Sequence, residues 1–219
     1  MRFRYLTFDC YGTLIDWKRG IEASQAGVFG ESLRGKALLD AYVLSEKIEE
    51  KEYKKYREVL RRSALRLSKR LGVNVSQEAA KGFAASVPSW PAFGDSVRFL
   101  QEAGAKGYRR YILSNIDTDM LESTIRINGL EVDGYVTAEQ VGSYKPKRGH
   151  WLRFMEMTGA RRDEVLHVAQ SVFHDIAPTG KLGISSAWVN RYKEPMRLGV
   201  HPQFVSDTLA HLATLLDGK

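Results

Sequence analysis

The segment FRYLTFDCYGTL, residues 3–14, decides the fold of this chain. Its first part, Phe3–Phe8, is apolar or β-favouring on both faces, which is typical of a strand buried within a parallel sheet. The strand leads into Asp9, and Gly12 marks a tight turn away from it. Open α/β sheets bind their ligands beyond the carboxyl ends of the strands, so we expect Asp9 to lie in a functional crevice.

Similar apolar runs recur along the chain, with helical patterns between them. The runs are Tyr111–Leu113, Val132–Val136, Val165–Ala169 and Ile184–Val189. The helical patterns are Asp95–Ala103, Thr118–Asn128, Gly149–Thr158 and roughly Phe173–Leu182. Pro178 predicts that the last of these begins irregularly or is displaced. The alternation of strands and helices predicts an α/β fold with a parallel sheet.

Residues 17–89 break this alternation, because their patterns are helical throughout. One apolar helix face is predicted from the three- and four-residue spacings among Ile48, Tyr56, Val59, Leu60, Leu67 and Leu71. A last helix follows Ser76 and stops before Pro88. A helical block inserted after the first strand should cover the carboxyl ends of the sheet and act as a lid. We therefore expect a helical cap domain at 17–89 and a core domain at 1–16 and 90–219.

The composition is ordinary for a globular enzyme, with 43% hydrophobic and 27% charged residues among 219. No apolar run is long enough to cross a bilayer, and the first residues have no signal-peptide pattern, so we expect a cytoplasmic protein without membrane partners. The single cysteine, Cys10, excludes an intramolecular disulfide and a cysteine-rich metal site. Beside Asp9 on an extended strand, it is predicted to be a buried structural thiol on the opposite face.

The net charge of +7 does not by itself indicate a nucleic-acid partner. Basic residues alternate with acidic ones, as at 45–62, which is typical of solvated helix faces, and we find no nucleic-acid-binding module. A positive field can help to attract a small anion. We expect a small anionic substrate and no nucleic acid, in a monomer or a homodimer.

Three later segments carry polar side chains where predicted strands end. Ser114 and Asn115 can contact anionic oxygens, and Lys145 supplies a fixed positive charge. The third segment contains the polar side chains Gln170, Ser171, His174 and Asp175. Each segment alone is as typical of an ordinary turn as of a site, so their combination carries the prediction.

In order and spacing, these segments resemble the four motifs of the haloacid dehalogenase (HAD) superfamily. The similar stretches are, in motif order, Phe8–Leu14, Leu113–Asn115, Tyr144–Pro146 and Ala169–Asp175. The helical insertion lies where that family has its cap domain. The resemblance implies a Rossmann-like parallel-sheet core, an inserted helical cap and a hydrolase with Asp9 as its nucleophile.

Tyr11 indicates the branch of the family. Phosphatases of the superfamily have a second aspartate at this position, which protonates the leaving oxygen, whereas an unperturbed phenol has a pKa of about 10 and is a poor proton donor. A halide leaves as an anion and needs no proton. Together with Trp188–Arg191, the Phe-Asp-x-Tyr-Gly-Thr-Leu pattern resembles the L-2-haloacid dehalogenases of type II.

The resemblance implies that Asp9 attacks the halogen-bearing carbon and forms an ester with the enzyme. Lys145 would keep the Asp9 carboxylate ionised and oriented. Asp175, with Ser171 and His174, would position the water that hydrolyses the ester. The remaining substrate-binding residues would be Tyr11, Thr13, Ser114 and Asn115. No metal or other cofactor is required for this chemistry.

The sequence also departs from the family pattern. Gln170 stands where magnesium-dependent relatives have aspartate, residues 41–46 lack the cap arginine of haloacid dehalogenases, and Trp151 replaces a substrate-contacting tyrosine. The main prediction is dehalogenation of short 2-haloalkanoic acids. The alternatives are a magnesium-dependent phosphatase acting on a small ester and a catalytically idle HAD-fold binding protein.

Several other side chains are predicted to be structural. His167 lies inside a predicted strand, which favours a core or sheet-edge histidine over a ligand. The aromatic residues Trp90, Phe93 and Trp151 are expected to pack in the core or between cap and core, with part of the group lining the pocket.

Overall fold

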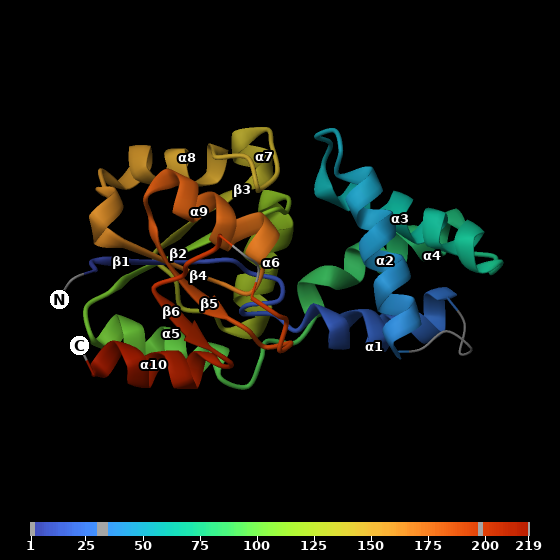
Figure 1. Cartoon of the computed structure of the whole chain (residues 1–219). Coiled ribbons are helices and arrows are strands. Elements are labelled where there is room, and N and C mark those ends of the chain that lie inside the picture. The colour runs from blue at the N-terminus through green and yellow to red at the C-terminus, as the bar shows by residue number, and fades with distance from the viewer. Residues whose placement is uncertain (1–2, 30–34, 197–198, 219) are drawn as a thin grey trace.

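The structure is a computed structural model that describes residues 3–29, 35–196 and 199–218. Its parallel strands are β1 (Tyr5–Phe8), β2 (Arg109–Ser114), β3 (Gly134–Thr137), β4 (Val165–Ala169), β5 (Ser185–Val189) and β6 (Phe204–Ser206). They form one sheet in the order β3-β2-β1-β4-β5-β6 (Figure 1). The strand order reverses at β1, so the crevice of the sheet opens at the carboxyl end of this strand, where Asp9 follows.

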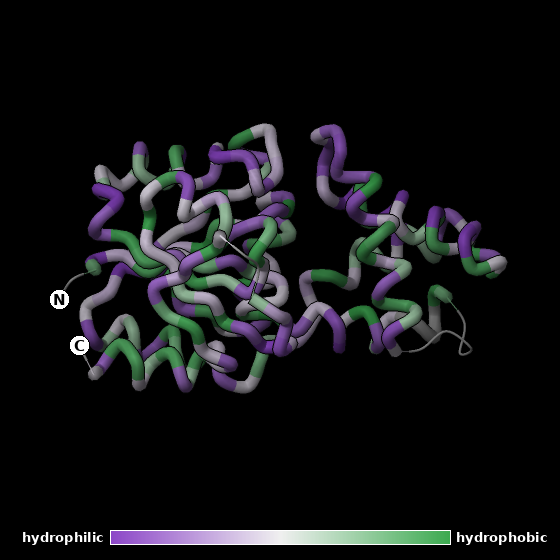
Figure 2. The backbone as a smooth tube through the Cα atoms, viewed as in Figure 1, coloured by the Kyte–Doolittle hydropathy of each residue, from purple (hydrophilic) through white to green (hydrophobic). Residues whose placement is uncertain are grey.

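Helices cover both faces of the sheet. One face packs against α5 (Ser96–Ala105), α6 (Thr118–Asn128) and α10 (Leu209–Asp217). The other packs against α7 (Ala138–Val141), α8 (Gly149–Thr158) and α9 (Ala177–Leu182). Along β1, Leu6 contributes to the first core and Tyr5 to the second, because side chains alternate along a strand. Hydrophobic segments gather along the strands in the interior of this body (Figure 2).

The cap stands beside the sheet at the end where the strands finish (Figure 1). It consists of α1 (Trp17–Phe29), α2 (Gly35–Glu49), α3 (Tyr56–Leu71), α4 (Gln77–Ser86) and the short 3₁₀ helix η1 (Val87–Ser89). Its apolar interior includes Leu38, Leu67 and Phe83, all fully buried. The predicted fold class, a parallel-sheet core with an inserted helical cap, is confirmed; we propose residues 17 and 89 as the limits of the cap.

In addition to the chain connections, a charged contact joins the cap to the core. Asp117, which is buried before α6, accepts hydrogen bonds from the backbone N–H groups of Tyr56 (2.6 Å) and Arg57 (3.1 Å). A core carboxylate thus caps the first turn of α3, where backbone N–H groups have no partner within the helix. The Arg57 guanidinium also donates to Asp117 and to the exposed Asp119.

Several predicted elements need correction. Ile48 lies in α2, whereas the other residues of the predicted apolar face lie in α3, because residues 50–55 separate the two helices. The sequence analysis did not predict β6, α10 or α7. We had expected Lys145 to follow a strand directly. This was wrong, because α7 lies between β3 and Lys145. Ser76 does cap α4, and its hydroxyl accepts from the N–H of Ala79 at 3.0 Å.

The helix predicted at Phe173–Leu182 is displaced at its start. A π-helical turn, η3 (Val172–Ile176), comes first, and α9 begins only at Ala177. Pro178 then lies in the first turn of α9, where its missing N–H group has no intrahelical partner to lose.

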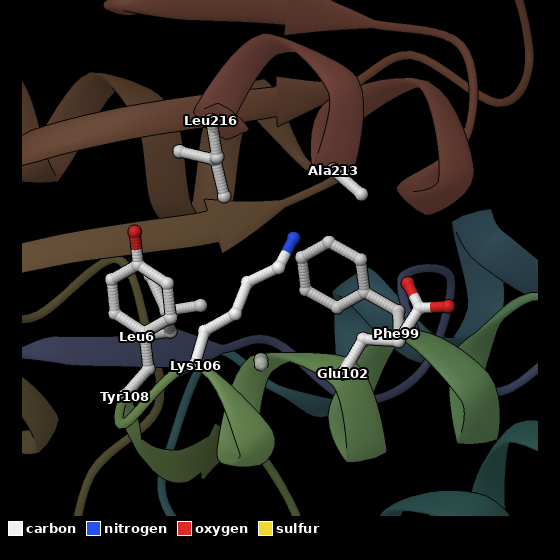
Figure 3. A pocket seen from close by; sticks show the side chains of 8 residues that line it. Leu6, Phe99, Glu102, Lys106, Tyr108, Ala213 and Leu216 are labelled. Carbon is white, nitrogen blue, oxygen red and sulfur yellow. The ribbon is translucent and has the colours of Figure 1, made fainter. Parts of the chain in front are cut away.

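A small hollow lies between α5, α10 and β1 (Figure 3). Its volume is about 10 Å³, which is room for about one water molecule, and Leu6, Phe99 and the Lys106 stem line it. The Lys106 ammonium bonds to Asp217 of α10, so this hollow is a packing defect between two helices. No helix within the described ranges is long and apolar enough to span a membrane.

Candidate active site

Asp9 lies in a loop whose conformation is fixed by several hydrogen bonds. The Thr13 hydroxyl donates to Asp9 Oδ2 at 2.9 Å and accepts from the Gln170 N–H at 2.9 Å. The Arg191 guanidinium donates to the Thr13 carbonyl from two nitrogens. Gly12 has φ +104°, a conformation that favours glycine. Asp9 Oδ2 is therefore fixed by the Thr13 hydroxyl. Thr13 in turn is held by Gln170, which follows β4, and by Arg191 in the loop after β5.

Lys145 connects the two predicted catalytic carboxylates. Its Nζ donates to Asp9 Oδ1 at 2.8 Å, to Asp175 Oδ1 at 2.7 Å and to the Leu113 carbonyl at 2.8 Å. Only 2% of Lys145 is exposed, and all three of its donor hydrogens have an acceptor. Burial lowers the pKa of Lys145, but the two carboxylates outweigh burial and raise it above its usual value.

Asp175 is fully buried and receives a second donor from the sheet. His167 Nε2 lies 2.9 Å from Asp175 Oδ1, and His167 Nδ1 lies 2.8 Å from Thr7 Oγ1. Burial favours a higher pKa for Asp175, but Lys145 and the His167 contact hold the pKa well below its usual range. Among the described residues, the second oxygen, Oδ2, has no hydrogen-bond partner. Asp175 is thus an ionised, oriented carboxylate with one uncommitted oxygen.

Asn115 acts on Lys145 through the backbone. Its Oδ1 accepts from the Lys145 N–H at 2.7 Å, and its Nδ2 donates to the Lys145 carbonyl at 3.1 Å. The neighbouring Ser114 is 2% exposed and lines the cavity, while its carbonyl accepts from the buried ring of His150 at 3.0 Å. Burial, aided by the Lys145 charge, lowers the pKa of His150 to about 3, so this ring is neutral.

Ser171 caps the π-helical turn η3, and His174 lies within this turn beside Asp175. The Ser171 hydroxyl accepts from the His174 backbone N–H at 3.0 Å and lies 3.1 Å from His174 Nδ1. Burial lowers the pKa of His174, which favours the neutral ring. On its other side, His174 Nε2 lies 3.9 Å from Glu50 of the cap. The two side chains line the cavity close to Asp175.

The Tyr11 side chain lines the same cavity, but its hydroxyl points to α6. The hydroxyl lies 2.7 Å from Thr124 Oγ1, and the ring packs edge-on against Trp90. Burial raises the pKa of Tyr11 well above its usual value, so it is an even poorer acid than an ordinary phenol. Cys10 is buried in the core of the opposite face, as predicted.

A cavity of about 1120 Å³ opens between these residues and the cap. Glu46 and Glu50 line its cap wall, and no arginine does so within the described ranges. Glu46 accepts hydrogen bonds from the hydroxyls of Tyr42 and Tyr56. Burial raises the pKa of Glu46, and burial together with the Glu46 charge raises that of Glu50 well above its usual value. The cap wall that lacks the expected arginine therefore carries two partly buried carboxyl groups, together with the exposed lysines Lys36, Lys47 and Lys51.

The structure brings together all the predicted site residues, but with different contacts. The Lys145 ammonium contacts both Asp9 and Asp175. Thr13 contacts Asp9, and Asn115 contacts the backbone of Lys145. Residues that line the cavity include Tyr11, Ser114, Asn115, Ser171 and His174. Within the described ranges, no group of three or more His, Cys, Asp or Glu side chains is arranged to hold a metal.

Two contacts were missed from the sequence. His167 was correctly predicted as a core histidine, but it lies in a central strand, and its contact with Asp175 was not foreseen. Arg191 was noticed only as part of a motif, although it secures the nucleophile loop. The eight-residue interval from His167 to Asp175 gives no periodic signal, because the chain leaves β4 and returns through η3. Of the aromatic group, Trp90 lines the cavity, whereas Trp151 is fully buried beside His167.

Comparisons with known proteins agree with this architecture. The family model of haloacid dehalogenase-like hydrolases matches residues 3–177. The chain is 27% identical over 114 residues to (S)-2-haloacid dehalogenase 1 of Pseudomonas sp. (strain CBS-3), and 26% identical over 106 residues to (S)-2-haloacid dehalogenase 4A of Burkholderia cepacia. These matches cover 51% and 48% of this chain, and 50% and 46% of the two relatives, so the chain spans about half the length of the curated relatives that it matches.

Its fold is also that of a solved structure described as L-2-haloacid dehalogenase from Xanthobacter autotrophicus with chloropropionic acid covalently bound. The TM-score is 0.87 at 21% identity, and the alignment covers 99% of each chain. At this identity the likeness shows the fold alone. The family match covers most of the chain, and on this evidence the chain belongs to the haloacid dehalogenase-like hydrolases.

Proposed function

We propose that this hydrolase removes a halide from short 2-haloalkanoic acids through an ester of Asp9. The observation that carries the proposal is the Lys145 ammonium, which touches both Asp9 and Asp175 in a buried site. Such an ammonium keeps a nucleophilic carboxylate ionised although water is largely excluded.

In the first step, an Asp9 oxygen attacks the halogen-bearing carbon and forms a carbon–oxygen bond. The carbon–halogen bond breaks, and the halide leaves with the bonding electrons. In the second step, water attacks the Asp9 ester carbonyl, releases the 2-hydroxy acid and restores the carboxylate. The uncommitted Asp175 Oδ2 is suited to orient this water, with Ser171 and His174 nearby.

Chemistry at carbon suits the residues better than phosphate-ester hydrolysis does. The phosphate ester of an ordinary alcohol needs a proton for its leaving oxygen, and Tyr11 is a weak acid whose hydroxyl faces Thr124. Magnesium favours several hard oxygen ligands with neutralising charge, yet Gln170 provides no carboxylate, and Lys145 already offsets one of the two negative charges of Asp9 and Asp175. A divalent cation would also engage the oxygen that must attack.

The decisive experiment compares 2-chloropropanoate with p-nitrophenyl phosphate, each with magnesium and with excess chelator. We expect release of chloride from the first substrate at the same rate in both conditions. Single-turnover hydrolysis in ¹⁸O-labelled water should place the label in the Asp9 carboxylate, because water attacks the ester carbonyl. The matched control is Asp9→Asn, which keeps the size but removes the charge and should lose at least about 10³-fold in turnover. Magnesium-dependent turnover of the phosphate ester alone would replace this proposal with the phosphatase.

A further inference from the structure

The cavity wall beside the nucleophile contains three hydrogen-bond donors that the mechanism has not used. They are the Lys18 ammonium and the Trp17 indole N–H, both at the start of α1, and the Tyr192 hydroxyl in the loop after β5. All three residues line the cavity. They lie on different elements from the carboxyl groups of Glu46 and Glu50.

The Tyr192 hydroxyl is the first observation. Its oxygen is buried, and among the described residues it has no hydrogen-bond partner. Burial, with the nearby charges of Asp16 and Asp9, raises the pKa of Tyr192, so the hydroxyl keeps its proton and is a donor. A buried donor without an acceptor destabilises the protein, and a bound acceptor would remove that cost.

Lys18 is the second observation. Its Nζ lies 3.3 Å from the centre of the Tyr192 ring, and within the described residues it forms no ion pair closer than 4 Å. The other lysines that line the cavity are the committed Lys145 and the exposed Lys36, Lys47, Lys51 and Lys147. Burial lowers the pKa of Lys18, and the carboxylates of Glu194, Asp16 and Asp40 partly offset this effect at longer range. Lys18 is therefore a half-buried cation on this wall without a direct ion-pair partner among the described residues.

Trp17 places these donors next to the nucleophile loop. A Cβ atom built on Gly12 would lie 3.3 Å from Trp17 Nε1, so the indole nitrogen lies directly against this loop. The Trp17 ring also meets the Tyr192 ring edge-on at 6.5 Å. Ring contacts thus hold the three donors in one cluster.

We propose that Lys18, Tyr192 and Trp17 form an anion subsite beside Asp9, which binds the carboxylate of a 2-halo acid or the departing halide. The identity of the anion rests on the proposed function; the subsite itself rests on the buried hydroxyl and the available cation. This subsite would orient the substrate in place of the missing cap arginine, because its donors are fixed beside Asp9 whereas the other free lysines of the cavity are exposed.

The test is calorimetric binding of unreactive anions, which does not require turnover. Propanoate, propanamide and bromide are titrated into the wild type, Tyr192→Phe and Lys18→Met. We expect the affinity for propanoate or for bromide to fall about tenfold or more in both variants, equivalent to about 1.4 kcal/mol. Propanamide, which is neutral and nearly isosteric with propanoate, should bind equally to all three proteins. Tyr192→Phe keeps the ring under Lys18, which protects the fold.

The matched control is Lys47→Met, which removes an exposed cation from the same cavity and should leave all three affinities unchanged. Loss of propanoate binding identifies the subsite as a carboxylate site, and loss of bromide binding identifies it as a halide site. Unchanged binding of both anions in the two variants, or an equal loss in Lys47→Met, would overturn the subsite. Loss of anion binding in an enzyme that releases no halide would keep the subsite and overturn the proposed function.

Discussion

Two carboxylates, one directly after β1 and one in η3, share a single ammonium. Without Lys145, Asp9 and Asp175 would face each other without this cation, and burial would then raise the pKa of Asp175. Removing one partner of a buried ion pair typically costs about 3–5 kcal/mol, because a charge is left uncompensated. The magnitude is large because Lys145 serves two carboxylates at once.

We therefore predict that Lys145→Met inactivates the enzyme and makes its stability depend on pH near neutrality. In the wild type, Asp175 stabilises the fold because its pKa is lower in the folded than in the unfolded protein. This stabilisation is fully present above the unfolded pKa of about 3.9, and it is lost as the pH falls through the folded pKa. In the variant, protonation should relieve the repulsion, so its Tm should rise from pH 7 to pH 5. A Tm that stays constant or falls over this range would contradict this account.

A second prediction concerns the contact between Thr7 and His167. Thr7→Val keeps the side-chain shape but leaves the buried Nδ1 of His167 without its partner, at a cost of about 1–3 kcal/mol. Because His167 also contacts Asp175, hydrolysis of the ester should slow while its formation changes little. Burst kinetics measure the two steps separately. Thr214→Val, on the exposed side of α10, is the control and should change neither step; equal slowing of both steps in Thr7→Val would remove His167 from the second step.

At this scale the sequence predicts which residues approach one another better than it predicts what they touch. Asp9, Lys145 and Asp175 follow from motif order, since parallel strands end at one edge. The role of Asn115 as a clamp on the Lys145 backbone does not follow, because it depends on how two loops meet. The contact of Tyr11 was likewise not predictable. Its place in the sequence puts the ring beside Asp9, but the direction of its hydroxyl depends on Thr124, which is 113 residues away.

Among the elements, α2 and the turn after it determine the charge of the cap wall. Glu46 and Glu50 are four residues apart and reach the same cavity. We predict that kcat/KM for an anionic 2-halo acid falls as the pH rises through the raised pKa of Glu50, because the ionised carboxylate repels the substrate. Glu50→Gln should flatten this part of the profile, which steady-state kinetics between pH 5 and 9 would detect.

The same substitution should stabilise the protein at alkaline pH. An acid with a raised pKa stabilises the fold below its unfolded value of about 4.3, and this contribution is lost as the pH rises through the folded value. Glu50→Gln should therefore have a higher Tm than the wild type at pH 8, by about 2–4 °C for each kcal/mol gained. Glu52→Gln, an exposed neighbour outside the cavity, should match the wild type in both experiments. If it behaved like Glu50→Gln, a general surface-charge effect would explain the data.

Long periodic elements were predicted well, and short ones were not. The bounds of α6, α8 and β4 agree with the patterns because apolar spacing persists over their length. The four-residue α7 is too short to show a period and is fixed by a local capping box between Thr137 and Gln140. The π-helical η3 was foreseen only as irregularity near Pro178, since its form depends on the contacts of Asp175 with Lys145 and His167.

For the whole molecule, the sequence predicted the parallel-sheet core and the helical cap, but not the contact that joins them. Helical spacing identified the inserted cap, and strand–helix alternation identified the sheet. The contact of Asp117 with the start of α3 joins residues about sixty positions apart, and no local pattern announces it. This joint affects both stability and the closure of the cavity.

We predict that Asp117→Ala lowers the free energy of unfolding by about 2 kcal/mol, because the first turn of α3 loses its cap and Arg57 loses its buried partner. The substrate KM should rise as well, since Tyr56 lies at this turn and also bonds to Glu46 in the cavity wall. Denaturant unfolding and steady-state kinetics measure the two effects. Asp119→Ala removes only the exposed contact of Arg57 and should cost less than about 1 kcal/mol with an unchanged KM. Equal effects of the two substitutions would mean that Asp117 is one surface ion-pair partner among others, and that the cap is positioned by its apolar contacts with the core instead.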